Sequence, residues 1–218
     1  MRIRRMRNRG PQKLGREMVC VGAKAPSWID GFGLTLLRGN VWTRAATLAL
    51  LAVGIEYGRV LAGRVPGLAV VALVGGGLAL CLLAAGLQPS ELGLGRDRIL
   101  ARLLGGLALG GVLLLPALVR WGGGPLLPPE LAVAAVAVSI GEEVAFRGAL
   151  FAALEEAGGP LLAVLGSAVL WTAAHGLSHP AQFLPAVAAA GLLLGTWRWA
   201  CRDLLGPIVG HVIADLAL

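Results

Sequence analysis

Charged residues are scarce in this sequence. Only 14% of its 218 residues are Asp, Glu, Lys or Arg, whereas 57% are hydrophobic, and the mean hydropathy is +0.79. Soluble domains carry about 25% charged residues. The shortage of charge therefore argues against a soluble domain, and it makes the lipid bilayer the first environment to consider.

Cysteine is also rare, and the three cysteines, Cys20, Cys81 and Cys201, are far apart in the chain. This spacing predicts neither a disulfide framework nor a zinc knuckle. The basic start of the chain continues into Gly10 and Pro11 rather than into an apolar core, so we expect no signal peptide. No repeat of fixed period is visible, which argues against a transporter built from repeats.

Apolar windows are abundant, and a transmembrane helix needs about 20 apolar residues to cross roughly 30 Å of hydrocarbon. Four windows carry no charge: 65–87, 103–119, 157–174 and 180–197. Two windows with a few charges and one short window add to these: 45–63, 131–154 and 204–218. Turn residues predict breaks between them, for example at 158–160, and the GxxxG pair Gly106 and Gly110 indicates close helix packing. The sequence predicts an all-α polytopic transmembrane helix bundle with six to seven spans.

Positive charge is concentrated near the start of the chain, and the net charge is +7. The basic residues that precede the first window include Arg2, Arg4, Arg5, Arg7, Arg9, Lys13, Arg16 and Lys24. Such an arm can bind nucleic acid, but no soluble domain follows it, and attraction to anionic lipid headgroups explains it more simply. We therefore predict a basic cytoplasmic arm at 1–41, a helical membrane domain at 42–218 and no nucleic-acid partner.

The loops between the windows support this orientation. The loops expected on the side of the arm contain Arg96, Arg98, Arg102, Arg198 and Arg202, whereas the opposite loops hold only Arg64 and Arg120. Cytoplasmic loops of membrane proteins carry an excess of Lys and Arg. We expect an integral membrane protein of a bacterial inner membrane with its N-terminus in the cytoplasm.

The segment GEEVAFRG at 141–148 places two carboxylates and a guanidinium inside an apolar window. Each charge near the bilayer centre costs a few kcal/mol, so such groups normally face a cavity or one another. Glu143 and Arg147 are four residues apart and can pair on one helix face, which predicts an ion pair that holds the helix. Glu142 lies about 100° around the helix and faces a different environment.

The remaining ionisable residues of the second half occur at helix spacing. Trp171 and His175 are four residues apart, as are His211 and Asp215. Counting along the windows makes one shared site near the middle of the membrane feasible.

Two chemistries suit this set of side chains. In the first, Glu142 is a general base for a trapped water, His175 holds that water, and His211 stabilises an oxyanion. In the second, Glu142, His175 and His211 bind Zn²⁺ with an open fourth position. Residue spacing alone does not decide between them.

Taken together, the three motifs resemble those of the CPBP family, the CAAX-processing and bacteriocin-processing intramembrane endopeptidases, also called the Abi family. The resemblance covers about 90–218 and includes the Leu-Gly-Leu step at 92–94. The family motifs EExxxR, FxxxH and HxxxN/D correspond here to Glu142, Glu143 and Arg147; Trp171 and His175; and His211 and Asp215.

The resemblance implies roles for these residues. Glu142 would activate water beside His175, while His211 and Asp215 would form the oxyanion site. Glu143 and Arg147 would support and tune the site. A glutamate mechanism without a cofactor is favoured over the zinc alternative.

Two departures from the family pattern affect these roles. Trp171 replaces the usual Phe, which keeps an aromatic wall and is expected to change only the pocket width. Asp215 stands where the eukaryotic enzymes have Asn. An ionised Asp would oppose an oxyanion, so Asp215 must be protonated, orient His211 or bind a metal.

Three other ionisable residues are expected to be uninvolved. His179 follows the second motif in a loop, where we expect a solvated surface position. Glu56 and Arg59 are three apart, which predicts a self-neutralising pair near a span end.

Three functions compete for this pattern. The first is an endopeptidase that hydrolyses a membrane-associated protein or peptide at the bilayer, and the second is a non-catalytic immunity or scaffold protein that binds a peptide partner. The third is a proton-coupled transporter, which should show polar residues along a path across the bilayer. Outside the cluster the windows are nearly bare of such residues, and no motif residue is lost. The sequence therefore predicts an intramembrane peptidase.

Overall fold

In the computed structural model, the described residues are 39–120 and 127–217, and their regular structure is entirely helical. This confirms the predicted all-α fold. The predicted arm at 1–41 lies almost wholly outside the described residues, and the first described helix begins at Val41. The helices are α2 (Val41–Gly63), α3 (Ala69–Leu82), α4 (Ile99–Arg120), α5 (Pro129–Glu142), α6 (Phe151–Ala174), α7 (Leu184–Cys201) and α8 (Leu205–Ala217).

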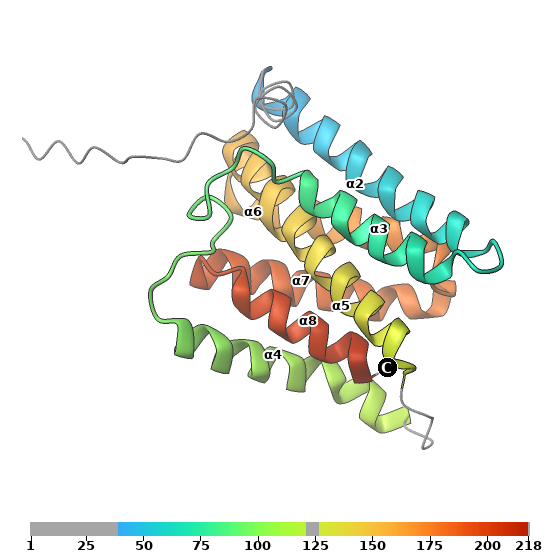
Figure 1. Ribbon diagram of the computed structural model, residues 1–218. Helices are drawn as coiled ribbons and strands as arrows, with labels where there is room; N and C mark the ends of the chain where they lie inside the picture. The colour runs from blue at the N-terminus through green and yellow to red at the C-terminus, as the bar shows by residue number, and fades with distance from the viewer. Residues whose placement is uncertain (1–38, 121–126, 218) are drawn as a thin grey trace, which may run out of the picture.

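The helices form one bundle (Figure 1). Helix α4 packs on α8, α3 packs on α5, and α6 packs on both α7 and α2. A π-helical segment, η1 (Glu143–Leu150), joins α5 to α6, and the short 3-10 turns η2 (His175–Leu177) and η3 (Ala181–Phe183) join α6 to α7.

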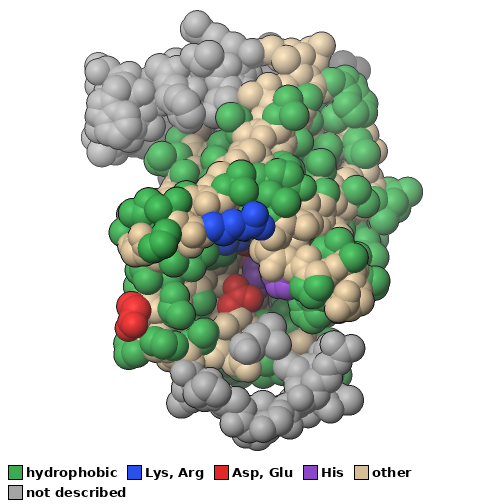
Figure 2. All heavy atoms as spheres, turned by 90° about the vertical axis from the view of Figure 1, so that its right-hand side faces the viewer, with side chains coloured by type: hydrophobic (Ala, Val, Ile, Leu, Met, Phe, Trp, Pro, Cys, Tyr) green, Lys and Arg blue, Asp and Glu red, His purple; other side chains and the backbone are tan. Residues whose placement is uncertain are grey.

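The outer surface of the bundle is apolar. Three helical stretches are long and apolar enough to cross a membrane, Val41–Gly63, Pro129–Leu177 and Ala181–Cys201, and shorter apolar helices accompany them. Leu50 is 76% exposed, Leu100 70% and Leu161 69%, and hydrophobic side chains spread over the face in Figure 2. Such a surface is suited to the hydrocarbon of a bilayer, because apolar side chains in hydrocarbon do not order water around them. The chain is an integral membrane helix bundle.

Glycines set the length and direction of several helices. The charge-free window 65–87 is helical only over Ala69–Leu82. A turn at Gly67 (φ +80°) precedes this helix, and a turn at Gly86 (φ +87°) follows it. The predicted break at 158–160 is present: Gly159 has φ +80° and ψ −177° inside the stretch assigned to α6. Positive φ strains any residue with a Cβ. The two halves of α6 fold back so that a Cβ on Gly166 would lie 3.0 Å from Leu154 Cδ1.

Small residues allow the helices to approach closely beside the ionisable cluster. A Cβ added to Gly141 would lie 2.3 Å from the carbonyl oxygen of Gly77, and one added to Gly77 would lie 2.4 Å from that of Ala137. Helices α3 and α5 are therefore in backbone contact directly before Glu142. At the α4–α8 contact, a Cβ on Gly106 would lie 2.6 Å from Val209, in agreement with the close packing that the GxxxG pair predicts.

Candidate active site

The candidate site begins where α5 changes into a π-helix. Glu142 is the last residue of α5, and Glu143 is the first residue of η1. Such segments are rare and occur frequently at functional sites, because the wider turn redirects side chains. The sequence pattern had indicated an ordinary α-helix here. The local result is that Glu142 faces α2 and α6, whereas Glu143 faces α8, as the contacts below show.

Glu142 lies at the centre of the cluster and is 1% exposed. Its Oε1 accepts a hydrogen bond from Arg59 Nη2 at 2.6 Å, and its Oε2 accepts one from Trp171 Nε1 at 2.6 Å. The Nε2 atoms of His175 and His211 lie 3.6 and 4.0 Å from the same Oε2. Four side chains from three helices and the adjoining turn thus converge on one carboxylate.

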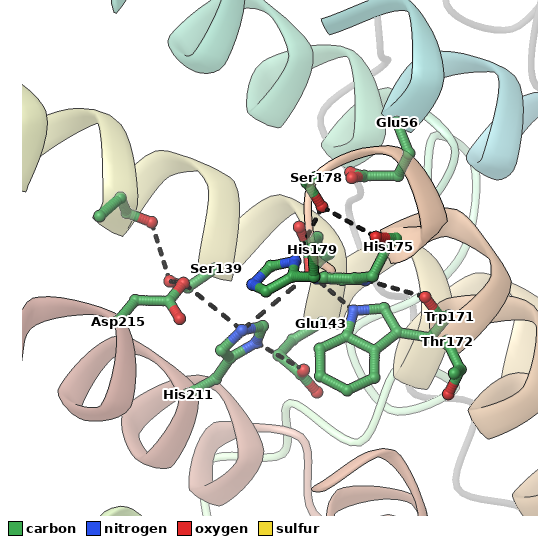
Figure 3. A network of polar contacts seen from close by, with 12 residues as sticks. Glu56, Ser139, Glu143, Trp171, Thr172, His175, Ser178, His179, His211 and Asp215 are labelled. Atoms are coloured by element: carbon green, nitrogen blue, oxygen red, sulfur yellow. Dashed lines mark hydrogen bonds and ion pairs between the residues drawn. The ribbon is translucent and has the colours of Figure 1, made fainter. Parts of the chain in front are cut away.

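Both histidines are oriented through Nδ1 (Figure 3). His175 Nδ1 lies 2.8 Å from the carbonyl oxygen of Trp171, and His211 Nδ1 lies 2.9 Å from Glu143 Oε1. A carbonyl or carboxylate oxygen accepts, so in each case Nδ1 is the donor. Each ring then presents its Nε2 toward Glu142, as is usual for imidazoles held from behind.

Glu143 and Arg147 form the predicted ion pair, with Arg147 Nη1 2.9 Å from Glu143 Oε1 and both side chains fully buried. The Arg147 guanidinium carbon lies 4.2 Å from the centroid of the Trp171 ring, within cation–π range. Among the described residues, Glu143 Oε2 and Arg147 Nε and Nη2 have no hydrogen-bond partner. The pair supports the site from behind, because the same Glu143 oxygen orients His211.

Asp215 lies next to His211 and borders the outside. Its Oδ2 is 3.4 Å from His211 Nε2, and its side chain is 30% exposed. Ser139 Oγ lies 2.8 Å from Asp215 Oδ2 and also 2.8 Å from the carbonyl oxygen of Ala135. Ser139 Oγ can donate to either acceptor, or to both in a three-centre hydrogen bond. A protonated Asp215 would instead donate to Ser139 Oγ.

Trp171 does more than the sequence indicated. The expectation that it changes only the pocket width is wrong, because its indole N–H donates to Glu142 Oε2. Phe, the usual residue of the family, has no donor. The indole also lies edge-on to both histidine rings, with centroids 4.6 Å from His175 and 5.4 Å from His211.

Arg59 and Glu56 also belong to the site. They form the predicted pair, with Nε–Oε2 2.9 Å, but the pair is not self-neutralising, because Arg59 also binds Glu142. The exposed fraction is 8% for the Arg59 side chain and 1% for that of Glu56. The rule that identified Glu142, a charge inside an apolar span, applies equally to these residues and could have identified them.

His179 is half-buried rather than a solvated surface residue. Its ring stacks on Phe183 with centroids 5.1 Å apart and lies 5.2 Å from His175. Burial lowers the pKa of His179, and the neighbouring His175 lowers it further. The two aromatic rings lie beside the site at the 3-10 turns that join α6 to α7.

Two groups of the site lie toward one end of the bundle. His175 directly follows α6, and Asp215 precedes the end of α8 by two residues. Figure 2, which views this end of the molecule, shows a hollow in which acidic and histidine side chains are visible.

The contacts of Glu142 are relevant to the alternative in which Glu142, His175 and His211 bind Zn²⁺. Among the described residues, no group of three or more His, Cys, Asp or Glu side chains is placed to hold a metal ion. Glu142, which the zinc alternative shares with His175 and His211, is bound instead by a guanidinium and an indole N–H. These contacts describe a hydrogen-bonded anion.

The fold and the site together define a membrane-embedded helix bundle with a buried carboxylate–imidazole cluster suited to hydrolysis. Residues 124–217 match the family described as type II CAAX prenyl endopeptidase, Rce1-like. This match to a peptidase family confirms the resemblance to CPBP proteins. The match contains all seven motif residues, whereas Glu56 and Arg59 lie outside it. No curated protein and no solved structure matches the chain.

Proposed function

We propose that this membrane peptidase hydrolyses a peptide bond of a membrane-associated protein or peptide by means of a water activated by Glu142. The observation that carries the proposal is the convergence of His175 Nε2 and His211 Nε2 on Glu142 Oε2, at 3.6 and 4.0 Å. These separations exceed direct hydrogen bonds, and they suit a water that bridges the three groups.

The proposed reaction uses the groups in the following way. Glu142 accepts a proton from the water while His175 holds it, and the water oxygen attacks the scissile carbonyl carbon. His211, protonated between Glu143 and Asp215, donates through Nε2 to the oxyanion. The C–N bond then breaks as the proton passes from Glu142 to the leaving amine nitrogen.

Asp215 takes part in this proposal as a neutral acid. The contacts of Ser139 with both Ala135 O and Asp215 Oδ2, each at 2.8 Å, accommodate a neutral Asp215 that donates to Ser139 while Ser139 donates to Ala135. A neutral carboxyl group does not oppose the oxyanion, and it takes the place of the amide that relatives with Asn have there. The partly exposed position of Asp215 lets it contact a bound substrate.

The location follows from the distribution of positive charge. The start of α2, the loop before α4 and the α7–α8 junction lie at one end of the bundle. Two contacts join these segments to their neighbours: Leu204 N donates to Gly93 O at 3.1 Å, and Arg202 binds Glu155 at 2.6 Å. Arg44 pairs there with Glu156. We propose that this end is cytoplasmic, together with the N-terminus, in a bacterial inner membrane.

The test is cleavage of membrane-anchored peptides by the purified protein in detergent or liposomes. Quenched fluorescent peptides with a prenylated and with an acylated cysteine serve as probes. Wild type is compared with Glu142→Ala, His211→Ala and the control Glu130→Ala, which alters an exposed carboxylate on the same helix.

The expected result is a loss of at least about a thousandfold in kcat for Glu142→Ala, because general-base catalysis and the oriented water are lost together, and none for Glu130→Ala. Full activity of Glu142→Ala would contradict the mechanism. Loss of wild-type activity on chelation, with recovery on adding Zn²⁺, would favour the zinc alternative. Peptide binding without cleavage by wild type would favour the non-catalytic scaffold.

A further inference from the structure

The site receives an arginine from outside the part of the chain that matches the peptidase family. Arg59 on α2 donates from Nη2 to Glu142 Oε1 at 2.6 Å and to Glu56 Oε2 at 2.5 Å, and from Nε to Glu56 Oε2 at 2.9 Å. One guanidinium thus bridges two buried carboxylates. We propose that Arg59 is a positioning residue that holds Glu142 as an oriented anion, and that Glu56 fixes Arg59 for this role.

Gly76 on α3 leaves room for the Arg59 side chain. A Cβ added to Gly76 on α3 would lie 2.7 Å from Arg59 Cβ and 2.8 Å from its Cδ. The side chain therefore runs along a surface that only glycine leaves open. Since α3 is in backbone contact with α5 through Gly77 and Gly141, the place that admits Arg59 also fixes the helix that carries Glu142.

Charge balance gives Arg59 a task beyond packing. The cluster contains four acidic side chains, Glu56, Glu142, Glu143 and Asp215, the last of them neutral in the proposed function, and two guanidiniums, those of Arg59 and Arg147. In a buried environment these acids compete for the two cations and for protons. Arg147 is bound to Glu143, so Arg59 is the guanidinium that keeps Glu142 ionised, beside the protonated His211 that the proposed reaction uses. It occupies Oε1 and leaves Oε2 to face the two histidines.

This proposal rests on the proposed role of Glu142 as the base, and the experiment separates the two. The kcat and KM of Arg59→Gln, Arg59→Lys and Glu142→Ala are measured over pH 5–9 on whichever fluorescent peptide wild type cleaves. Arg44→Gln, near the other end of α2, is the matched control, because Arg44 pairs with a largely exposed glutamate. Full activity of Glu142→Ala would remove the proposed function whatever Arg59 does.

Arg59→Gln is expected to lower kcat at least tenfold with little change in KM, and to move the acid limb of the kcat profile to higher pH. The reason is that without an adjacent cation Glu142 takes up a proton more readily. Arg59→Lys keeps the charge, so the acid limb stays in place, but it cannot bridge two carboxylates in the same geometry, and kcat falls. A merely structural arginine would change melting temperature without moving the pH profile.

If Arg59→Gln retains the wild-type kcat and pH profile, the proposal is wrong. If Arg59→Gln does not fold, Arg59→Lys and Gly76→Ala decide, since Gly76→Ala displaces the arginine without removing its charge. Wild-type kcat in both of these folded variants would equally overturn the proposal.

A second inference comes from the location of the entrance relative to the basic end. The groups at the entrance, His179 and Asp215, follow α6 and precede the end of α8, whereas the basic loops join the opposite helix ends. Figures 1 and 2 agree, because the hollow lies at the end away from the loop before α4. With the basic end in the cytoplasm, we infer that the site opens to the non-cytoplasmic side and takes a substrate segment exposed there.

Two cysteines at opposite ends of the bundle test this inference. Native Cys201 is exposed at the basic end, and Ser178 lies beside the entrance. Single-cysteine proteins, one retaining Cys201 and one carrying Ser178→Cys in a cysteine-free background, are treated with a membrane-impermeant maleimide in right-side-out and inverted vesicles. Labelling of Ser178→Cys in right-side-out vesicles and of Cys201 in inverted ones is expected. The reverse pattern, or labelling of both in one orientation, would overturn the inference without affecting the proposed catalytic residues.

Discussion

The substitution Trp171→Phe separates the hydrogen bond that Trp171 makes from the ring that it contributes. Phe is the usual residue of the family at this position, and it keeps an aromatic face beneath the Arg147 guanidinium, now 4.2 Å from the Trp171 ring centroid. What it removes is the N–H donor that lies 2.6 Å from Glu142 Oε2. The change therefore tests one contact of the central carboxylate.

The magnitude follows from the kind of contact. A hydrogen bond to a charged group contributes about 1.5–3 kcal/mol, and Glu142 is too buried for water to replace the lost donor readily, at 1% exposure. We expect Trp171→Phe to lower the free energy of unfolding by about that amount. Trp171→Ala also loses the ring and leaves a cavity, so we expect a loss of about 3–5 kcal/mol.

The assay is reversible unfolding in mixed micelles, with peptide cleavage measured on the same preparations. Loss of orientation of Glu142 should lower kcat roughly tenfold, the equivalent of about 1.4 kcal/mol. Trp199→Phe on α7, at a 44% exposed tryptophan, is the matched control. Stability and kcat of Trp171→Phe equal to those of wild type would refute the reasoning, because the indole contact would then contribute nothing.

Three further predictions concern the support of the site. Arg147→Ala removes the guanidinium partner of Glu143, whose side chain is 0% exposed, and leaves it only His211. The free energy of unfolding should therefore fall by about 3–5 kcal/mol. The same unfolding assay measures it, and a loss below about 1 kcal/mol would contradict the buried pair. Gly141→Ala places a Cβ 2.3 Å from Gly77 O, and we expect misassembly or a loss of about 1–3 kcal/mol in the free energy of unfolding. Gel filtration and thermal melting measure these outcomes. The control Gly75→Ala, where an added Cβ meets open space, should be neutral. Ser139→Ala should lower kcat more than it raises KM, because Asp215 loses its 2.8 Å partner; a change in KM alone would assign Ser139 to substrate binding instead.

The sequence predicted most of the site because intramembrane charges are costly and therefore few. Glu142, Glu143, Arg147, His175 and His211 stand out in apolar windows without any knowledge of the fold, and the structure brings them together. Their proposed roles stay predictions until the variants above are assayed. The same reasoning failed for Arg59, because a nearby Glu56 appeared to neutralise it. Local spacing shows which charges can pair, but it does not show which third charge a distant helix brings to them.

Helix ends and backbone irregularities were the least predictable features. The π-helical segment after Glu142 was expected to be an ordinary α-helix. This segment packs against distant parts of the chain, because a Cβ added to Gly148 would lie 3.0 Å from Leu92 Cδ2 and 3.5 Å from Leu204 Cδ2. Contacts between distant segments leave no periodic trace in the sequence.

By itself, the sequence determined the solvent, the helical fold class and the inventory of reactive groups. A chain with 57% hydrophobic residues must bury its backbone polar groups in helices within hydrocarbon, and ionisable groups persist there only when something requires them. The tertiary structure decided which donor meets which oxygen of Glu142, that Trp171 is a donor, and that α2 supplies a cation to a peptidase site. These depend on ångström-scale distances between helices far apart in the chain, which close packing sets and composition does not.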